Sequence, residues 1–455
     1  VGEESEGGCV KVFWPRGISW ITPEGGSISD SSNWDPLMPT ISDSVSFSLR
    51  SQTSISVDDD FPFQQMFIGP GKYAFDLQGM NRSLGDGGET INLQGVPGLE
   101  AEFKLRGGIL TVDGEIHIGE GDLPGKIAIG SNSEGQLGQL RVNGLYLQHD
   151  AGELIVELKT ERPPLIQLKN VSPQLDGILS LHFANGYVPA YRDIIPLLTS
   201  EVVDDNAGQF SMVVIRDPLP DGLYIKLNYE GGDGGTSGSI SAEVDLLENL
   251  FGYGEPNGES VSGIATDLVI AELEGSTRTD GVNEDIAVIT QDTLYVFLSD
   301  GHGGTLTQAI YYLAKDGYSS LAAIDAGDLD GNGTIDLVVV NSDTNEFIPI
   351  FNEYNDISSF TIGNPVSTGP NPVDVLAMNL DIDADDDVVV ACSGYSLSDG
   401  QIDFFEAVPG LLGGFSGGGS LLSPGNPKEI DPGDVNNDKD FQIYVSFGSG
   451  NSVGK

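Results

Sequence analysis

Oxygen-bearing side chains at alternate positions, placed directly before a β-strand pattern, constrain this chain more than any other feature. The segment reads AGDLDGNGTIDLVVV from Ala326. Its oxygen donors are Asp328, Asp330, Asn332, Thr334 and Asp336. Donors spaced in this way around a tight loop turn their oxygens inward, and a calcium ion takes about six to eight such oxygens. The segment therefore predicts a Ca²⁺-binding loop that leads into a strand.

The same pattern recurs in phase further along the chain. At an offset of 51 residues, the second set of predicted ligands is Asn379, Asp381, Asp383, Asp385 and Asp387. A third set follows 55 residues later and consists of Asp434, Asn436, Asp438 and Asp440. Acidic turns without a metal are the alternative interpretation of each set, and the repetition favours the metal.

Two neighbouring features limit this prediction. The third loop ends on Gln442, a neutral and weaker ligand than the aspartates at that position in the other loops. An earlier, degraded loop keeps Glu272, Glu274 and Asp285 but has lost the spacing, so we expect no cation there. An EF-hand would need helices on both sides and a Glu at the twelfth position, where this chain has Val339 within a strand pattern.

An acidic loop leading into DLVVVN, repeated at about 51 residues, resembles the FG-GAP/VCBS-type β-propeller repeat. The resemblance implies that each repeat is one four-stranded blade whose acidic loop binds Ca²⁺. It covers roughly residues 262–455, enough for fewer than four blades, whereas such propellers usually close with about seven. We therefore expect an incomplete, open or partnered propeller.

Short strand patterns separated by Gly, Asn, Asp and Pro dominate the first half of the chain. Many alternate apolar and polar residues, as Ile116 with Ile118 and Ile127 with Ile129 do, which suits strands with one buried face. Short strands joined by Gly- and Asn-rich corners favour a right-handed parallel β-helix, and a β-sandwich or jelly roll is the alternative.

Near the start of the chain, an Asn-Trp pair is followed by a Pro and an Asp-x-Val-x-Phe strand, at Asn33, Trp34, Pro39, Asp43, Val45 and Phe47. This pattern resembles the start of autotransporter-like β-strand-repeat proteins of bacterial surfaces. Residues 175–232 resemble the closing segment of the same proteins, and the resemblance implies a β-solenoid over roughly residues 15–245.

The sequence thus predicts an all-β protein in two parts. Residues 1–254 form a β-solenoid-like domain, and residues 255–455 form propeller-like blades. The boundary is placed in Gly-, Ser- and Pro-rich sequence such as GYGEPNGESVSG.

Charge and composition exclude several functional classes. The formal net charge is −49, from 69 Asp+Glu against 20 Lys+Arg, so we expect no nucleic-acid partner. No apolar run reaches the length of a membrane span. Cys9 and Cys392 are too few and too far apart for a disulfide framework, and two unpaired buried thiols are the favoured interpretation over one long-range disulfide.

Catalytic motifs are absent from the sequence. The four histidines are isolated, no phosphate-binding loop is present, and Lys104, Arg106, Lys126 and Arg141 are scattered through the solenoid. We therefore expect a non-enzymatic, calcium-stabilised structural or adhesive protein that is secreted or lies on the bacterial cell surface. Its partners would be other surface proteins or copies of itself, assembled into filaments or a surface layer. The alternative is a glycan-binding module or polysaccharide-active β-helix enzyme, for which Trp14, Trp20 and Trp34 would be candidate aromatic contacts.

Overall fold

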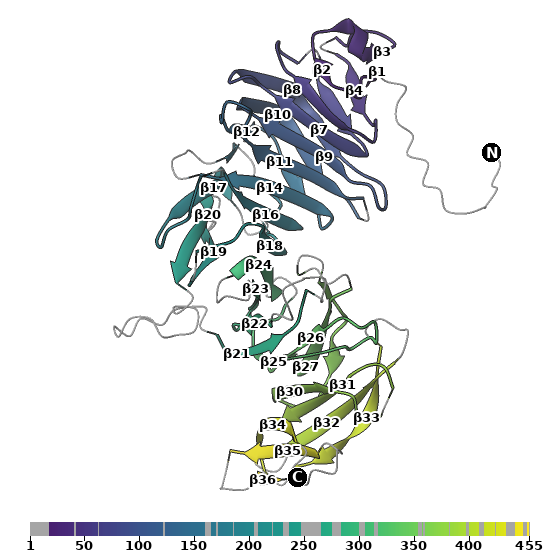
Figure 1. Ribbon diagram of the computed structural model, residues 1–455, viewed down its shortest axis with the longest axis vertical. Coiled ribbons are helices and arrows are strands. Elements are labelled where there is room, and N and C mark those ends of the chain that lie inside the picture. The colour runs from purple at the N-terminus through teal and green to yellow at the C-terminus, as the bar shows by residue number, and fades with distance from the viewer. Residues whose placement is uncertain are drawn as a thin grey trace, which may run out of the picture.

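The computed structural model is built almost entirely of β-strands, and the part of the chain that it describes contains no α-helix (Figure 1). The described residues are 18–40, 42–61, 63–121, 123–159, 165–169, 172–184, 186–203, 208–220, 222–230, 236–246, 265–274, 284–299, 305–313, 317–353, 357, 360–381, 383–396, 400–408, 414–423, 425–433, 442–448 and 453–454. The predicted boundary at residue 255 lies outside these ranges.

A β-solenoid forms the first half, as the sequence predicts. The chain alternates between two stacks of parallel strands. One stack contains, in spatial order, β4 (Ser44–Phe47), β6 (Gln65–Ile68), β8 (Asn81–Leu93), β10 (Gly108–Ile118), β12 (Gly138–Val142), β15 (Ile166–Leu168) and β17 (Ile194–Val203). The other contains β5 (Gln52–Ser56), β7 (Gly71–Asp76), β9 (Ala101–Arg106), β11 (Gly125–Gly130), β14 (Gly152–Leu158), β16 (Ile178–Phe183) and β18 (Met212–Ile215).

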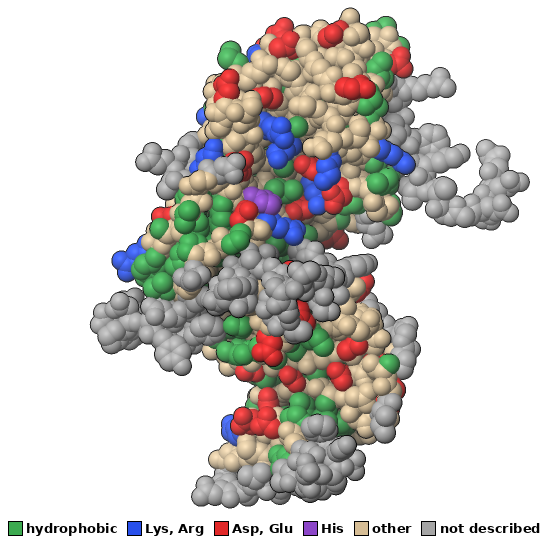
Figure 2. Space-filling view, in the orientation of Figure 1, with side chains coloured by type: hydrophobic (Ala, Val, Ile, Leu, Met, Phe, Trp, Pro, Cys, Tyr) green, Lys and Arg blue, Asp and Glu red, His purple; other side chains and the backbone are tan. Residues whose placement is uncertain are grey.

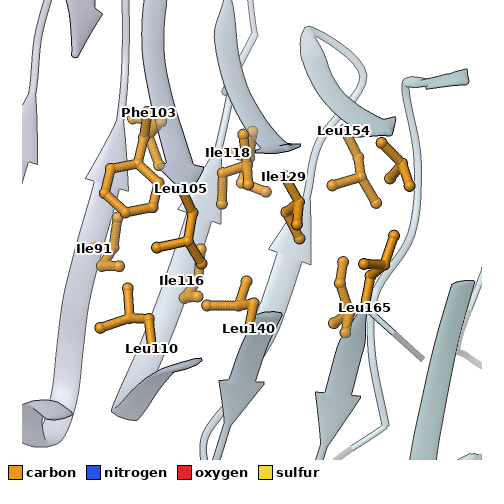
Figure 3. Packing of buried hydrophobic residues seen from close by; sticks show 14 of the residues in the cluster. Ile91, Phe103, Leu105, Leu110, Ile116, Ile118, Ile129, Leu140, Leu154 and Leu165 are labelled. Atoms are coloured by element: carbon orange, nitrogen blue, oxygen red, sulfur yellow. The ribbon is translucent and has the colours of Figure 1, made fainter. Parts of the chain in front are cut away.

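Strand alternation sends one residue in two into the solenoid interior, where equivalent side chains of successive turns stack (Figure 3). One such stack, in register throughout, consists of Ile55, Phe75, Leu105, Ile129, Val156, Leu181 and Ile215, all buried. The predicted inward positions Ile116, Ile118, Ile127 and Ile129 are also buried. Corners between the turns depend on glycine at places such as Gly108, where φ is +96° and a Cβ would come within 2.2 Å of the Met80 carbonyl oxygen.

An aromatic cluster closes the first turn of the solenoid. Trp20 of β1 (Ile18–Trp20) meets Trp34 of β3 (Trp34–Asp35) edge to face, with ring centroids 5.1 Å apart. Both rings are buried and pack on Phe47. β3 pairs antiparallel with β1, and the short β2 (Gly26–Ser27) pairs parallel with β5.

The other end of the solenoid is covered by antiparallel strands. β17 pairs with β20 (Thr236–Leu246), which in turn pairs with β19 (Leu223–Glu230). β18, the last parallel strand of the second stack, pairs antiparallel with β24 (Thr305–Tyr312) from the second half of the chain. One 12-stranded sheet therefore runs from the solenoid into the acidic half.

Four antiparallel repeat sheets make up the described part of the second half (Figure 1). The first contains β21 (Asp267–Ala271), β22 (Asp285–Ile289), β23 (Thr293–Ser299) and β24. The second contains β25 (Leu321–Gly327), β26 (Asp336–Asn341), β27 (Glu346–Phe351), β28 (Thr361–Ile362) and β29 (Val366–Ser367). The third contains β30 (Pro372–Met378), β31 (Asp387–Cys392), β32 (Gln401–Ala407) and β33 (Phe415–Leu422), and the fourth contains β34 (Pro427–Gly433), β35 (Gln442–Phe447) and β36 (Val453–Gly454).

The first strands of successive repeat sheets lie beside one another and are joined by carboxylates. Asp267 of β21 accepts the N–H of Ile324, and Asp325 of β25 accepts the N–H of Ala377. Asp374 of β30 accepts the N–H of Ile430 at 2.6 Å. Each of the first three repeat sheets therefore uses one half-buried aspartate to hold the first strand of the next.

Candidate metal centre

The loop between β25 and β26 brings three of its five predicted ligands together. Oxygens of Asp328, Asp330 and Asp336 lie within 4.8 Å of one another. Gly331 and Gly333 both have positive φ values, 72° and 87°, and so allow the loop to turn tightly enough to gather these carboxylates. We call residues 328–336 loop I.

The other two predicted ligands of loop I are engaged within the loop. Asn332 accepts the backbone N–H of Thr334 at 2.7 Å through its side-chain oxygen. The Thr334 hydroxyl donates to that oxygen and to the carbonyl of Asn352. The Thr334 backbone carbonyl remains the group that position 7 of an EF-like loop offers to a cation.

Asp336 is the most buried member of loop I and is fixed from two sides. Its Oδ2 accepts the N–H of Leu329 at 2.9 Å and its Oδ1 accepts the N–H of Asn352 at 2.7 Å. Burial, together with the nearby Asp330 and Asp328 charges, raises its pKa to about 7 against the lowering effect of the two N–H donors.

This carboxylate has exact counterparts in two other repeat sheets. Asp285, at the start of β22, accepts the N–H groups of Leu273 and Ser299. Asp387, at the start of β31, accepts those of Leu380 and Ala407. Because the first repeat sheet keeps this arrangement after losing the spacing of its acidic loop, the aspartate at the ninth position has a structural role independent of a cation.

A hard divalent cation fits the remaining chemistry of loop I. Oδ2 of Asp328 accepts the N–H of Gly333, but its Oδ1 is buried and has no hydrogen-bond partner. Burial raises the pKa of Asp328, and the charge of Asp330 acts in the same direction. Carboxylate oxygens are the ligands that Ca²⁺ and Mg²⁺ prefer, and a cation would satisfy the unpaired oxygen and neutralise the clustered charge.

Loop II, residues 379–387, repeats much of this hydrogen bonding in the third repeat sheet. Asp381 accepts the N–H of Asp383, as Asp330 accepts that of Asn332. Asn379, Asp381 and Asp383 are exposed, and the carboxylates of loop II do not reach the mutual proximity found in loop I. Asp385 is only 1% exposed, its Oδ1 has no hydrogen-bond partner, and burial together with Asp383 raises its pKa to about 6.

The third predicted loop and the degraded loop lie partly or wholly outside the described residues. Asp434, Asn436, Asp438 and Asp440 lie outside the described residues. In the degraded loop, Glu272 has a buried Oε2 without a hydrogen-bond partner, and the segment 275–283 that follows is not described. Metal binding at these positions stays a prediction.

Three of the four basic residues that look scattered in the sequence share one outer face of the solenoid (Figure 2). Lys104, Arg106 and Lys126 project from neighbouring strands β9 and β11. Lys126 bridges Glu100 at 2.8 Å and Glu153 at 2.6 Å. Arg141 lies in the other stack, where it donates to Gln167.

The histidines are less isolated than the sequence suggests. His117 lies 3.1 Å from Glu115, and its ring centroid is 6.3 Å from that of His149. His182 lies 3.4 Å from Asp217. Among the described residues these groups do not gather three ligand atoms as closely as loop I does.

Cys392 is a free, buried thiol, as favoured above, and Cys9 lies outside the described residues. Within the described part, no helix is long and apolar enough to cross a membrane.

No protein-family model matches the chain, and no curated protein matches it.

Proposed function

We propose that this is a structural or adhesive protein of the bacterial cell surface whose acidic half is stabilised by bound Ca²⁺. The observation that carries the proposal is the grouping of Asp328, Asp330 and Asp336 in loop I, with an unpaired buried oxygen on Asp328. The residues identified provide binding and packing, and we propose no catalytic role for them.

The electrostatics of the chain support a cation-dependent fold. With a formal net charge of −49, the folded state is destabilised by self-repulsion that bound cations reduce. Calcium is present at millimolar concentration outside cells, which is enough to fill sites of modest affinity. The proposal therefore places the protein outside the cell.

We further propose that the four repeat sheets are blades of an open, propeller-like array. Their antiparallel strand order supports this, as does the adjacency of their first strands. The first blade is already held by the solenoid through β18 and β24, which favours an open arrangement over a closed wheel.

Thermal unfolding of the full chain tests the central proposal. Calcium at about 100 times its dissociation constant stabilises a one-site protein by about 2.7 kcal/mol. For an unfolding unit of about 150–250 residues, the size of the acidic half, this stabilisation raises the Tm by roughly 5–10 °C relative to the protein in chelator. Magnesium is the matched comparison for ion selectivity. Identical melting curves in calcium and in chelator would contradict the proposal.

For partners, we propose other surface proteins or further copies of this chain, assembled into filaments or a surface layer. Electron microscopy of the purified full chain in calcium distinguishes filaments from single particles. Single particles at every protein concentration would exclude self-assembly under those conditions and leave a different partner.

A glycan-binding module is the second candidate, because Lys104, Arg106 and Lys126 share one solenoid face. Acidic glycans would be the matching class of ligand. Trp20 and Trp34 are buried and therefore do not supply an exposed aromatic platform, and Trp14 is not described. A glycan array without binding, together with no turnover of polysaccharides, would exclude this candidate and its enzymatic form.

A further inference from the structure

Loops I and II contact each other directly through Asp328 and Asp386. The N–H of Asp328 donates to Oδ2 of Asp386 at 2.9 Å. The N–H of Asp386 donates back to the carbonyl oxygen of Asp328 at 2.7 Å. A predicted ligand of loop I is thereby held, through both its backbone N–H and its backbone carbonyl, by a residue of loop II that is not itself a predicted ligand.

The packing around this contact leaves little space for one loop to move alone. A Cβ added to Gly327 would lie 2.8 Å from Oδ2 of Asp386 and 2.9 Å from Cβ of Ala377. A Cβ added to Gly331 would lie 3.6 Å from Ala384, at ordinary van der Waals distance. Close packing of this kind transmits small displacements from one loop to the other.

Each loop also has a carboxylate oxygen that lacks a partner, one on a residue of the contact and one on its neighbour in the chain. They are Oδ1 of Asp328 in loop I and Oδ1 of Asp385 in loop II, both buried. Asp385 precedes Asp386 in the chain and is almost fully buried. A cation bound to Asp385 would therefore act on the residue next to the one that positions Asp328.

We propose that Asp386 is a positioning residue that couples cation binding in loop I to cation binding in loop II. The inference rests on the proposed cation binding and adds its regulation. A cation in loop II fixes Asp385, which orders Asp386, which in turn orients Asp328 for a cation in loop I. Linkage requires the effect to be reciprocal, so that either cation increases the affinity of the other loop.

Calorimetric titration of CaCl₂ into the full chain tests this coupling with three proteins. Asp330→Ala disables loop I, and Asp381→Ala/Asp383→Ala disables loop II. All three proteins carry Asp434→Ala/Asp438→Ala in addition, so that the third predicted loop adds no binding. Independent loops predict that the isotherm with both loops intact is the sum of the two single-loop isotherms. Coupled loops predict that each single-loop variant binds calcium at least about fivefold more weakly than the same loop does when both loops are intact.

Substitution of Asp386 assigns the coupling to this residue. Asp386→Ala removes the acceptor for the Asp328 N–H. Its calcium isotherm should equal the sum of the isotherms measured when Asp386→Ala is combined with the loop I substitution and with the loop II substitutions. Asp386→Asn removes the charge but keeps a carbonyl oxygen at the same place, so the coupling should persist. Persistence of coupling in Asp386→Ala would overturn the role of Asp386.

A readout without calcium completes the test. In chelator, the Asp328 amide should exchange with solvent faster in Asp386→Ala than in the wild type, and at the wild-type rate in Asp386→Asn. Unchanged exchange in Asp386→Ala would also overturn the inference. Calcium binding at both loops with additive isotherms overturns the coupling alone, whereas no calcium binding at either loop overturns the proposed function as well.

Discussion

Gln308 provides Ile225 with both hydrogen bonds that a neighbouring strand would provide. Its Nε2 donates to the Ile225 carbonyl at 2.9 Å, and its Oε1 accepts the Ile225 N–H at 3.2 Å. The backbone of Gln308 is at the same time the register partner of Ile215 on β18. Gln308, which is fully buried, therefore joins the first repeat sheet to β18 and also to β19 at the end of the solenoid.

Gln308→Met should weaken this junction. Methionine has a similar shape but leaves the buried N–H and carbonyl of Ile225 unpaired, which costs about 2–3 kcal/mol of unfolding free energy. Urea denaturation measures the loss, and amide exchange at Ile225 locates it. Gln291→Met, at an exposed turn, is the control and should change neither. Equal stability of the two variants would contradict the role of Gln308.

Asp285→Ala should destabilise the protein equally in calcium and in chelator. The substitution leaves the N–H groups of Leu273 and Ser299 without their acceptor, at a cost of about 2–4 kcal/mol. The measurement is the unfolding free energy under both conditions, with the exposed Asp431→Ala as control. A loss seen only in calcium would show that this position acts through a cation.

Asp330→Asn should do the opposite and affect the protein mainly when calcium is present. The amide keeps an acceptor for the Asn332 N–H but removes one charge from the three carboxylates. We expect the calcium-induced rise in Tm to fall by more than half, with the Tm in chelator unchanged or slightly higher. Asp343→Asn, outside loop I, should leave the calcium response intact. An unaltered response in Asp330→Asn would remove loop I as the site.

In chelator, protonation of Asp374 should make the protein more stable in mild acid than at neutral pH. Burial raises its pKa to about 7, and Asp267 and Glu429 add to the shift. Because the folded state holds this proton between about pH 4 and 7 and the unfolded state does not, stability falls as pH rises through that range.

The variant Asp374→Asn should therefore flatten the pH dependence of Tm between pH 5 and 8. Asp285 and Asp336 have raised pKa values and act in the same direction, so the informative quantity is the difference between variant and wild type. Melting curves in chelator at several pH values measure it. Parallel profiles for the two proteins would contradict the assignment to Asp374.

Lys126→Met should destabilise the solenoid by leaving Glu153 buried with only a distant cation. Burial alone would raise the pKa of Glu153, but Lys126, with help from Ser180 and Arg216, more than offsets this and the pKa is lowered. Arg216 remains 3.9 Å away, so we expect a loss of about 2–3 kcal/mol, below the range for a fully unpaired buried charge.

The double variant Lys126→Met/Glu153→Leu should recover most of that stability, because it removes the charge that would otherwise be stranded. Chemical denaturation of the wild type, of the two variants and of Glu153→Leu together makes a double-mutant cycle. A double variant no more stable than Lys126→Met would show that the effect comes from lost packing of the lysine stem.

The architecture of the solenoid was predictable because its signal is local. Alternation such as Ile116 and Ile118 reports which face of a strand is buried, and the strands starting near Val45, Tyr73 and Lys126 are found close to where the pattern predicts them. The antiparallel pairing of β18 with β24 was not predictable, because about 90 residues separate the two strands and neither carries a pattern that specifies its partner.

The sequence predicted that the acidic loops repeat, but not which aspartates bind backbone N–H groups as well as a cation. From their spacing alone, Asp330 and Asp336 are equivalent predicted ligands. The structure separates them, because Asp336 also accepts two backbone N–H groups while Asp330 accepts one local N–H. The retention of Asp285 in the degraded loop was the available signal, since an acid that persists after the ligand spacing is lost indicates a second function.

The pairing of β18 with β24 also affects how the chain can fold. The parallel strands of the solenoid can stack in order as the chain emerges, but the edge of β18 stays open until residues 305–312 arrive. An open strand edge is a site of intermolecular pairing. A chain that stopped at Leu246 would therefore present that edge to other molecules, and the first repeat sheet protects the finished solenoid from aggregation.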